Sequence, residues 1–299
     1  RKQSMNGCAK KRFENYKQQP LELVFDKSFT GKLSQFGLNP DRRTPSGIKA
    51  AIIREKGTNG EREMAYMLYL AGFDVKDVTM TDLVSGRETL EDINMVVYCG
   101  GFSNSDVLGS AKGWAGTFLF NPKAKAALDN FYARKDTLSL GVCNGCQLMM
   151  ELGLITPEDK KQGKMLHNDS HKFESAFLGV TVPMNRSVMF GSLSGSKLGI
   201  WVAHGEGKFS LPYPEDHYNV VLKYSYDEYP GNPNGSDYSV AGIASQDGRH
   251  LAMMPHLERA CFPWENAYYP ADRVKEDQIT PWMEAFVNAR KWVEAHMQK

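Results

Sequence analysis

The stretch Leu138-Ser-Leu-Gly-Val-Cys-Asn-Gly-Cys-Gln147 decides the fold, because two kinds of secondary structure meet within it. Leu138–Val142 is apolar and predicts a buried strand, whereas Gly145–Leu152 predicts a helix. Cys143 lies in the turn between them, with a glycine two residues away on either side. Such a turn can reverse the chain sharply and expose the central side chain, as in a nucleophile elbow. A buried structural cysteine fits this window equally well.

Short apolar segments and amphipathic segments alternate on the N-terminal side of this turn. The alternation predicts a parallel sheet with helices on both faces, which is a doubly wound, mostly parallel α/β fold. The predicted strands are Ala50–Ile53, Phe73–Val78 and Met95–Tyr98, and the predicted helices are Glu61–Ala71 and Pro122–Tyr132.

The pattern changes after Leu154 to shorter β-like segments separated by turns, which predicts short β-rich additions. Tyr229–Ser236 is rich in proline, glycine and asparagine and is predicted to be a surface loop. Near the end of the chain, Thr280 and Pro281 are predicted to cap and open a packing helix. The β-like segments are Ile200–Ala203, Val220–Leu222, Val240–Ile243 and Leu251–Met254.

Residues 1–47 are polar and turn-rich, so we expect a lead-in or linker there and one domain over residues 48–299. Because the first residue is Arg1, we expect the chain to be a piece of a longer protein. Several basic residues in the lead-in are predicted to face solvent or a partner. They are Lys10, Lys11, Arg12 and Lys17.

The 299 residues carry 36 basic and 35 acidic side chains, and the net charge of +1 gives no electrostatic case for nucleic acid or an anionic membrane. No apolar run approaches the roughly 18 to 20 residues that a membrane span needs, and the N-terminus lacks the apolar core of a signal peptide. The five cysteines are irregularly spaced, which argues against a disulfide framework. We therefore expect a cytoplasmic protein with neither nucleic-acid nor membrane partners.

Cys143 and Cys146 form a C-x-x-C pair, which leaves two further interpretations of the turn. One is a redox disulfide, because such pairs also open a helix. The other is a zinc site, which needs more ligands than this pair supplies. Since the other cysteines are single and lack a histidine pair at metal-ligand spacing, we expect no bound metal.

Three further segments accompany the cysteine turn. Gly100–Asp106 follows a predicted strand, Ala203–Gly207 reads Ala-His-Gly-Glu-Gly, and Met254–Arg259 reads Met-Pro-His-Leu-Glu-Arg. Together with Cys143 they resemble the class I (triad) glutamine amidotransferases, which implies a flavodoxin-like doubly wound sheet. Over about residues 48–295 the chain most resembles the C-terminal glutaminase domains in the family of large, single-chain phosphoribosylformylglycinamidine synthases.

The resemblance implies that Cys143 is the nucleophile, that His256 is its general base and then acid, and that Glu258 orients His256. Residues two apart on an extended segment point to the same side, so the His-x-Glu spacing suits such a pair. The same spacing recurs in His204 and Glu206. The residues alone do not separate the two pairs, and only the resemblance gives His204 and Glu206 a supporting or substrate-binding role.

Glycines that directly follow a strand let the backbone approach a substrate and direct N–H groups toward it. By resemblance, one oxyanion donor is the N–H of Gly101 and the second is that of Asn144. Cys99 and Leu257 depart from the family pattern, which commonly has proline at both positions. The other residues that the resemblance places around a glutamine substrate are Gly100, Phe102, Gln147, Asn168 and Ser170.

The resemblance implies hydrolysis of L-glutamine to glutamate and ammonia through a cysteine thioester. The ammonia is expected to pass to a synthase domain that makes formylglycinamidine ribonucleotide in purine biosynthesis, with residues 1–47 leading in from that region. The chain has no P-loop sequence, so ATP and magnesium are expected on the synthase domain and no cofactor in this one. The alternatives are another cysteine hydrolase or redox-stress protein of similar fold, and a degenerate regulatory domain.

Overall fold

The computed structural model describes residues 2–16 and 21–297, so the predictions for Arg1 and Lys17 lie outside the described residues. The helices are α1 (Lys2–Asn15), α2 (Glu61–Leu70), α3 (Met80–Ser85), α4 (Lys112–Phe120), α5 (Pro122–Ala133), α6 (Asn144–Glu151) and α7 (Met283–His296). The strands are β1 (Lys49–Arg54), β2 (Asp74–Thr79), β3 (Met95–Tyr98), β4 (Leu138–Val142), β5 (Lys164–Leu166), β6 (Glu174–Thr181), β7 (Lys197–His204), β8 (Lys208–Ser210), β9 (Asn219–Tyr224), β10 (Val240–Ala244) and β11 (His250–Met253).

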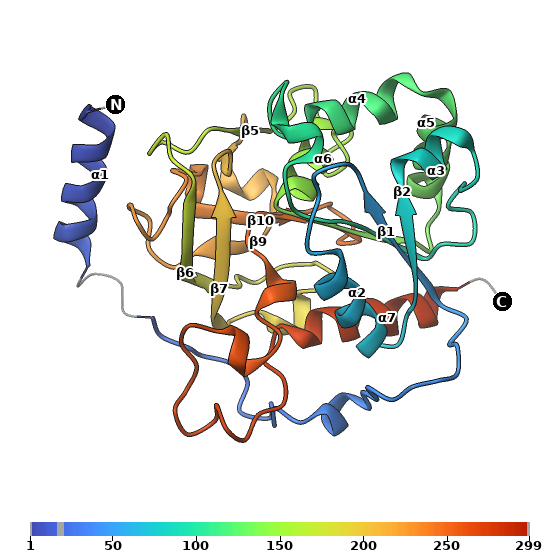
Figure 1. The fold of residues 1–299 in the computed structure, drawn as a ribbon. Coiled ribbons are helices and arrows are strands. Elements are labelled where there is room, and N and C mark those ends of the chain that lie inside the picture. Colours follow the sequence, from blue (N-terminus) through green and yellow to red (C-terminus); the bar gives the residue numbers. More distant parts are fainter. Residues whose placement is uncertain (1, 17–20, 298–299) are drawn as a thin grey trace.

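A nine-stranded mixed sheet in the order β2-β1-β3-β4-β11-β10-β9-β6-β7 forms the centre of the molecule (Figure 1). The strands from β2 to β11 pair in parallel, and those from β11 to β7 pair antiparallel. The predicted β-rich additions therefore extend the main sheet, except that β5 pairs with β8 in a small separate sheet. The predicted doubly wound α/β fold is confirmed.

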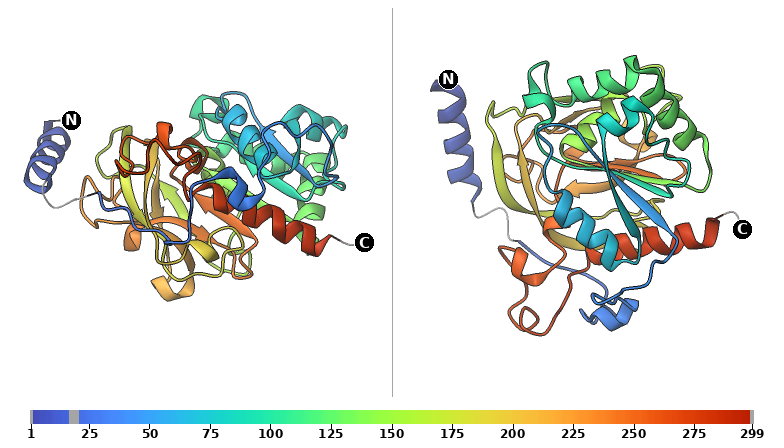
Figure 2. Two further views of the ribbon diagram at one scale, coloured as in Figure 1. Left: turned by 90° about the horizontal axis from the view of Figure 1, so that it is seen from below. Right: turned by 45° about the vertical axis from the view of Figure 1, so that its right-hand side comes forward.

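Helices cover both faces of the parallel part of the sheet. Figures 1 and 2 show α2 and α7 on one face and α4, α5 and α6 on the other. Strands covered on both faces need apolar residues throughout, and β3 and β4 are buried at every position. The sequence determines where α5 begins. The Asn121 side chain accepts hydrogen bonds from the N–H groups of Lys123 and Ala124, and Pro122 is the first residue of the helix.

The C-terminal helix begins later than the sequence predicts. Helix α7 starts at Met283 with Trp282 as its cap, not at Pro281. The Thr280 hydroxyl donates to the carbonyl oxygen of Ala260 at 2.6 Å and accepts from the N–H of Trp282 at 3.3 Å, so it satisfies a backbone donor in the turn that precedes the helix. Residues 281 and 282 form a turn instead, so this predicted boundary is wrong by two residues.

The prediction of a surface loop over Tyr229–Ser236 is also wrong, because the second half of this loop is buried. Asn232, Asn234 and Ser236 are each at most 5% exposed. Asn234 donates to the carbonyl oxygen of Gly207 at 2.8 Å, and Ser236 accepts from the N–H of Phe209 at 3.1 Å. Polar turn residues can be buried when their hydrogen bonds are satisfied, and here they hold the chain just after β7.

The lead-in contains a helix, α1, that the sequence did not predict. Figures 1 and 2 show α1 at the side of the molecule beyond β6. Its Arg12 donates to the hydroxyl of Tyr229 at 2.8 Å and lies 3.5 Å from Glu174, the first residue of β6. The boundary between lead-in and domain at residue 47 stays a prediction.

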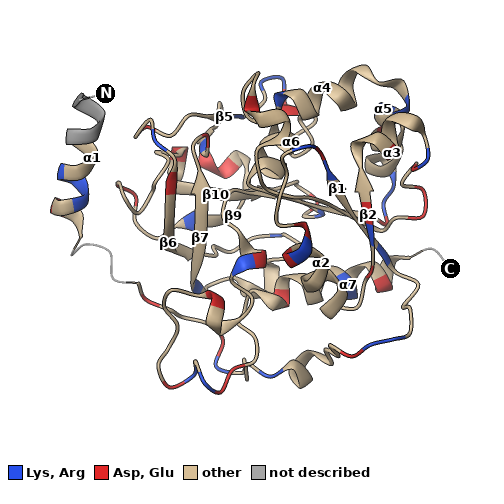
Figure 3. Cartoon of the chain, viewed as in Figure 1, with Lys and Arg blue, Asp and Glu red and all other residues tan. Residues whose placement is uncertain are grey.

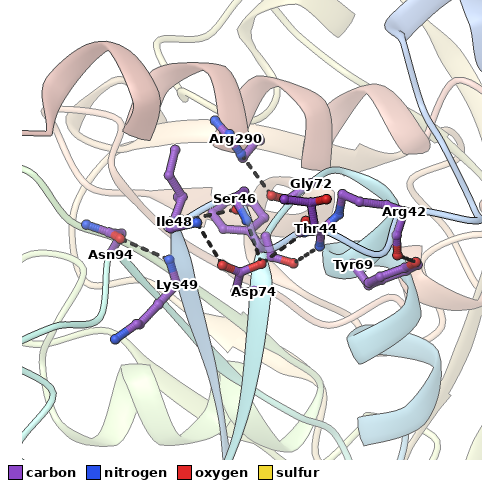
Figure 4. A network of polar contacts seen from close by, with 12 residues as sticks. Arg42, Thr44, Ser46, Ile48, Lys49, Tyr69, Gly72, Asp74, Asn94 and Arg290 are labelled. Atoms are coloured by element: carbon purple, nitrogen blue, oxygen red, sulfur yellow. Dashed lines mark hydrogen bonds and ion pairs between the residues drawn. The ribbon is translucent and has the colours of Figure 1, made fainter.

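The last part of the lead-in is tied to the sheet by a polar network (Figure 4). Asp74, at the start of β2, accepts hydrogen bonds from Arg42 at 2.9 Å and from the N–H groups of Ser46 and Gly47 at 3.0 and 2.8 Å. Arg42 also donates to the carbonyl oxygen of Phe73 at 2.6 Å. Residues 42–47 are thereby held in place just before β1 begins.

Charged residues lie mainly in loops and at strand ends, with both signs interspersed (Figure 3). The central strands contain almost none of them, because burying an unpaired charge costs free energy. Within residues 2–16 and 21–297, the helices are all too short or too polar to cross a bilayer.

Candidate active site

The turn between β4 and α6 holds Cys143 in a strained conformation. Its φ of 53° and ψ of −107° lie outside the regions that side-chain-bearing residues favour. Its N–H donates to the carbonyl oxygen of Met253 on the neighbouring strand β11 at 2.9 Å, which fixes the turn. A side chain at position 145 would collide with the carbonyl oxygen of Tyr98, so this close approach requires Gly145. The predicted sharp strand-to-helix turn is therefore present, but the Cys143 side chain is only 5% exposed and reaches the wall of a pocket, and its role as nucleophile stays a prediction.

The predicted base and its orienting carboxylate follow strand β11. His256 Nδ1 lies 2.7 Å from Glu258 Oε1, and both side chains are 2% exposed. The N–H of His256 donates to the carbonyl oxygen of Trp201 on β7 at 2.9 Å. Burial lowers the pKa of His256, but the charge of Glu258 and a hydrogen bond with Cys143 outweigh this effect and raise the pKa to about 10. The ring is therefore a strong proton acceptor.

Gly100 brings the cysteine and the histidine together. A Cβ atom added to Gly100 would lie 2.8 Å from His256 Cε1 and 3.3 Å from Cys143 Cβ. Both side chains therefore pack against this one glycine at the end of β3. Since Nδ1 of His256 is bound to Glu258, Nε2 is the nitrogen left to exchange a proton with Cys143.

The second His-x-Glu pair is arranged differently. His204 is 2% exposed, and neither of its ring nitrogens has a hydrogen-bond partner among the described residues. Burial and the nearby His256 lower the pKa of His204 to about 3, so its ring is neutral. Glu206 instead accepts from the N–H of Ser110 at 3.3 Å. The geometry favours His256 and Glu258 as the pair that serves Cys143.

The two predicted oxyanion donors occupy different backbone settings. Gly101 has a φ of 120°, and an added Cβ would lie 2.5 Å from the carbonyl oxygen of Gly57, so only glycine fits. Asn144 is the first residue of α6, where N–H groups have no acceptor within the helix and the helix dipole is positive. That both N–H groups bind an oxyanion stays a prediction.

A small pocket opens beside Cys143, and several predicted residues reach it. Gln147 lines the pocket, but its side chain already donates to the carbonyl oxygen of Glu206 at 2.8 Å and accepts from Asn144 at 2.9 Å. Phe102 lies at the rim, with its ring centroid 5.9 Å from that of Phe173. The lining residues are Gly101, Phe102, Asp106, Ser110, Cys143, Gln147, Phe173, Ala203, His204, Gly205 and Glu206.

The structure does not bring Asn168 and Ser170 to this pocket. Asn168 is fully buried, donates to the carbonyl oxygen of His204 at 2.8 Å and accepts from the N–H of Gly207 at 3.0 Å. The Ser170 hydroxyl accepts from the N–H of Lys172 at 3.3 Å. Asn168 thus holds the Ala203–Gly207 segment through its backbone and does not line the pocket.

The sequence did not identify part of the pocket wall, namely Asp106, Ser110, Phe173, Ala203 and Gly205. Asp106 ends the quoted Gly100–Asp106 segment, and a carboxylate shortly after a strand end was the signal that could have found it. Ala203 contributes its carbonyl oxygen, 3.7 Å from Cys143 Sγ, and side-chain chemistry offers no signal for such a contact.

The C-x-x-C pair does not form a disulfide, since Cys143 and Cys146 are both free. Burial raises the pKa of Cys146 well above its usual value, so this thiol is held in its neutral form. Within the described residues, no group of three His, Cys, Asp or Glu side chains is arranged to hold a metal ion.

Curated relatives cover most of this chain. Phosphoribosylformylglycinamidine synthase from Homo sapiens is 44% identical over 280 residues, which is 84% of this chain and 21% of the relative. The probable chloroplastic/mitochondrial enzyme of the same name from Arabidopsis thaliana is 44% identical over 266 residues, or 83% of this chain and 19% of the relative. The Schizosaccharomyces pombe enzyme is 37% identical over 308 residues and covers 96% of this chain. This chain spans about a fifth of the length of these relatives.

Solved structures show the same fold. PurLQS from Thermotoga maritima is similar with a TM-score of 0.59 and 26% identity, covering 84% of this chain and 99% of that one. A glutamine amidotransferase from Thermotoga maritima reaches a TM-score of 0.50 at 17% identity, covering 83% of this chain and 99% of that one, which shows the fold alone.

The family comparison agrees with the resemblance that the sequence predicted. The CobB/CobQ-like glutamine amidotransferase domain matches residues 47–293, which is more than half of the chain. The chain therefore belongs to the CobB/CobQ-like glutamine amidotransferase family.

Proposed function

We propose that this chain hydrolyses the side-chain amide of L-glutamine to glutamate and ammonia, with Cys143 as the nucleophile. The observation that carries the proposal is the convergence of a strained cysteine elbow and a buried histidine–carboxylate pair on Gly100. A cysteine needs little activation, because its thiolate is already accessible near neutral pH. The start of α6 beside it favours negative charge.

The proposed reaction has two steps. Cys143 gives its proton to His256 and attacks the amide carbon, and the N–H groups of Gly101 and Asn144 stabilise the oxyanion of the tetrahedral intermediate. The C–N bond then breaks, His256 protonates the leaving ammonia, and a thioester remains. In the second step His256 takes a proton from water, the hydroxide attacks the thioester, and glutamate and the thiol are released. Glu258 holds the His256 ring and stabilises its charged form throughout.

The fate of the ammonia follows from the relatives' printed names. We infer that a synthase region outside this chain accepts it and makes formylglycinamidine ribonucleotide, in keeping with the name phosphoribosylformylglycinamidine synthase. ATP and magnesium would bind in that region, and no cofactor in this one. A cytoplasmic location is also part of the proposal, although the name of the Arabidopsis thaliana relative places that protein in chloroplasts or mitochondria.

The thiol-redox alternative is disfavoured by the setting of Cys146. Its side chain is fully buried in α6 and its raised pKa holds it as the thiol, whereas an exchanging pair needs an accessible thiolate. A degenerate regulatory domain is disfavoured because Cys143, His256 and Glu258 are all present and positioned to react.

Labelling by a glutamine-like electrophile tests the proposal. The natural full-length protein should be modified at Cys143, and Cys143→Ala should lose both the modification and glutamine hydrolysis. Cys146→Ala is the matched control, and it should keep both. Glutamine hydrolysis that survives in Cys143→Ala would refute the proposal.

A further inference from the structure

The loop after β1 pairs with the glycines at the end of β3. The N–H of Asn59 donates to the carbonyl oxygen of Gly100 at 2.9 Å, and the N–H of Phe102 donates to the carbonyl oxygen of Gly57 at 2.8 Å. The C=O and N–H groups of a trans peptide point in opposite directions, so the bond to Gly100 also directs the N–H of Gly101 away from the loop. Among the described residues, no backbone group accepts a hydrogen bond from that N–H. The position of Asn59 therefore sets the direction of the first predicted oxyanion donor.

Arg259 connects the histidine–carboxylate pair to the same loop. Its Nη2 donates to Asn59 Oδ1 at 2.8 Å, and its Nε lies 3.8 Å from Glu258 Oε1. This oxygen of Glu258 is the one bound to His256 Nδ1. A Cβ atom added to Gly60 would lie 3.1 Å from Arg259 Nη2 and 3.5 Å from Glu258 Oε1, so both side chains pass close to the start of α2. One guanidinium group thus contacts the loop and the carboxylate together.

Glu258 has few other partners to fix its orientation. Within residues 2–16 and 21–297, its ion-pair contacts are with His256 and Arg259, and its Oε2 is buried without a hydrogen-bond partner. The last torsion of a glutamate side chain has a broad energy minimum, so a second charged contact restricts it. Arg259 is itself held by Glu63 on α2, whose Oε1 lies 3.5 Å from its Nε. The planar guanidinium suits this role, because its donors have a fixed geometry.

We propose that Arg259 and Asn59 are positioning residues that keep the predicted oxyanion donor and the histidine–carboxylate pair aligned with each other. The inference rests on the proposed glutamine hydrolysis. In that reaction the N–H of Gly101 and the ring of His256 serve the same tetrahedral intermediate, one at its oxygen and the other at its departing nitrogen. A shift of either group relative to the other therefore slows the reaction. Arg259 and Asn59 act only through the groups that they contact, since neither lines the pocket beside Cys143.

Steady-state kinetics of glutamine hydrolysis by the natural full-length protein test the inference. Asn59→Ala and Arg259→Ala should each lower kcat by about 10- to 100-fold, because misplacing a reacting group by about 1 Å costs up to about 100-fold. KM should change by less than about twofold, as expected when only the transition state is affected. Arg259→Lys keeps a cation near Glu258 and should be about threefold faster than Arg259→Ala. Arg62→Ala removes an exposed arginine from the first turn of α2 and should leave both parameters unchanged.

The double variant with Asn59→Ala and Arg259→Ala distinguishes a shared link from two separate effects. If the two residues act through the hydrogen bond between them, the double variant should be no slower than the slower single variant. Two separate effects would multiply instead. The thermal unfolding midpoint should stay within about 3 °C of the original in every variant, because Asn59 is exposed and Arg259 is 31% exposed.

The possible outcomes separate this inference from the proposed function. Losses that multiply in the double variant, or an unchanged kcat in either single variant, would overturn the inference. So would a raised KM at constant kcat, which would place the two residues in substrate binding, or losses that follow the unfolding midpoint, which would place them in the stability of the fold. If the unaltered protein does not hydrolyse glutamine, the proposed function itself is wrong and this inference falls with it.

Discussion

The parallel and antiparallel parts of the central sheet contribute to the site in different ways. The parallel strands β3, β4 and β11 end at one edge and deliver Gly100, Cys143 and His256 to it. The antiparallel strand β7 ends at His204, and the turn after it closes the pocket with His204 and Glu206. The parallel part holds the residues that we propose to react, and the antiparallel part shapes the pocket beside them.

The two parts are also supported differently. The residues proposed to react directly follow strands that are buried at every position, so their positions are set by close packing. The turn after β7 is held instead by buried amides and hydroxyls such as those of Asn168, Asn234 and Ser236. We therefore expect changes in the first part to affect the rate of the chemical step and the packing, and changes in the second part to affect substrate binding.

The largest expected effect comes from removing the imidazole of His256, which is the proposed base. His256→Asn leaves Cys143 without a proton acceptor, so kcat for glutamine hydrolysis should fall by about 100- to 10,000-fold. KM should change little, because His256 does not line the pocket wall that faces the substrate. Steady-state kinetics on the natural full-length protein measure both parameters. A kcat within threefold of the original would assign the base to another residue, with His204→Asn as the direct comparison.

Gly145→Ala should produce the next largest effect, on stability. The added methyl group would collide with the carbonyl oxygen of Tyr98 beneath the elbow, and an overpacked backbone contact costs about 1–3 kcal/mol. Gly116→Ala is the matched control in helix α4, because the nearest atom to its added Cβ is 3.9 Å away. The thermal unfolding midpoint should fall in the first variant and stay equal or rise in the second. Equal midpoints would contradict close packing at the elbow.

Asn168→Ala tests the polar support of the antiparallel part. The change leaves the His204 carbonyl oxygen and the Gly207 N–H without their partner, and each buried unsatisfied group costs about 1–3 kcal/mol. We expect faster hydrogen exchange over residues 204–207 and a higher KM for glutamine, with kcat changed less. Asn130→Ala, at an exposed position of α5, should leave both measurements unchanged. If kcat falls and KM does not, the two parts of the sheet do not divide their roles in this way.

The sequence predicted the parallel part well because its signals are local. Leu138–Val142 is apolar, glycines flank Cys143, and three segments between or after the predicted strands have a helical pattern, namely Glu61–Ala71, Pro122–Tyr132 and Gly145–Leu152. Helices α3 and α4 were not predicted. The antiparallel part depends on contacts between distant segments. Nothing near Asp106 in the sequence indicates that it meets Glu206, and the polar composition of Tyr229–Ser236 predicted exposure although tertiary hydrogen bonds bury it. The prediction for Asn168 failed for the same reason. We expected this polar residue to contact the substrate, but its side chain is buried and hydrogen-bonds to the backbone of the turn after β7.

The smallest expected effect lies at the far end of the parallel part, where Asp74 holds the lead-in (Figure 4). Burial raises the pKa of Asp74, but hydrogen bonds from Ser46, Arg42 and Gly47 outweigh this and lower the pKa below 3.8. A lowered carboxyl pKa stabilises the fold above pH 3.8, and this contribution is lost as the pH falls through the lower, folded-state value. Asp74→Asn should therefore weaken the protection of the Ser46 and Gly47 amides against hydrogen exchange at neutral pH by about 1 kcal/mol.

The difference between Asp74→Asn and the original protein should begin to shrink as the pH falls below 3.8 and should disappear below the lower, folded-state pKa of Asp74, where both side chains are uncharged. Asp41→Asn is the matched control, since Asp41 is exposed and precedes the network. It should leave the amide protection unchanged at every pH. A difference for Asp74→Asn that persists undiminished in acid would show that the shape of the side chain, and not its charge, holds residues 42–47 against β2. The lead-in would then be anchored by packing, as the reacting residues are, and polar anchoring would be confined to the antiparallel part of the sheet.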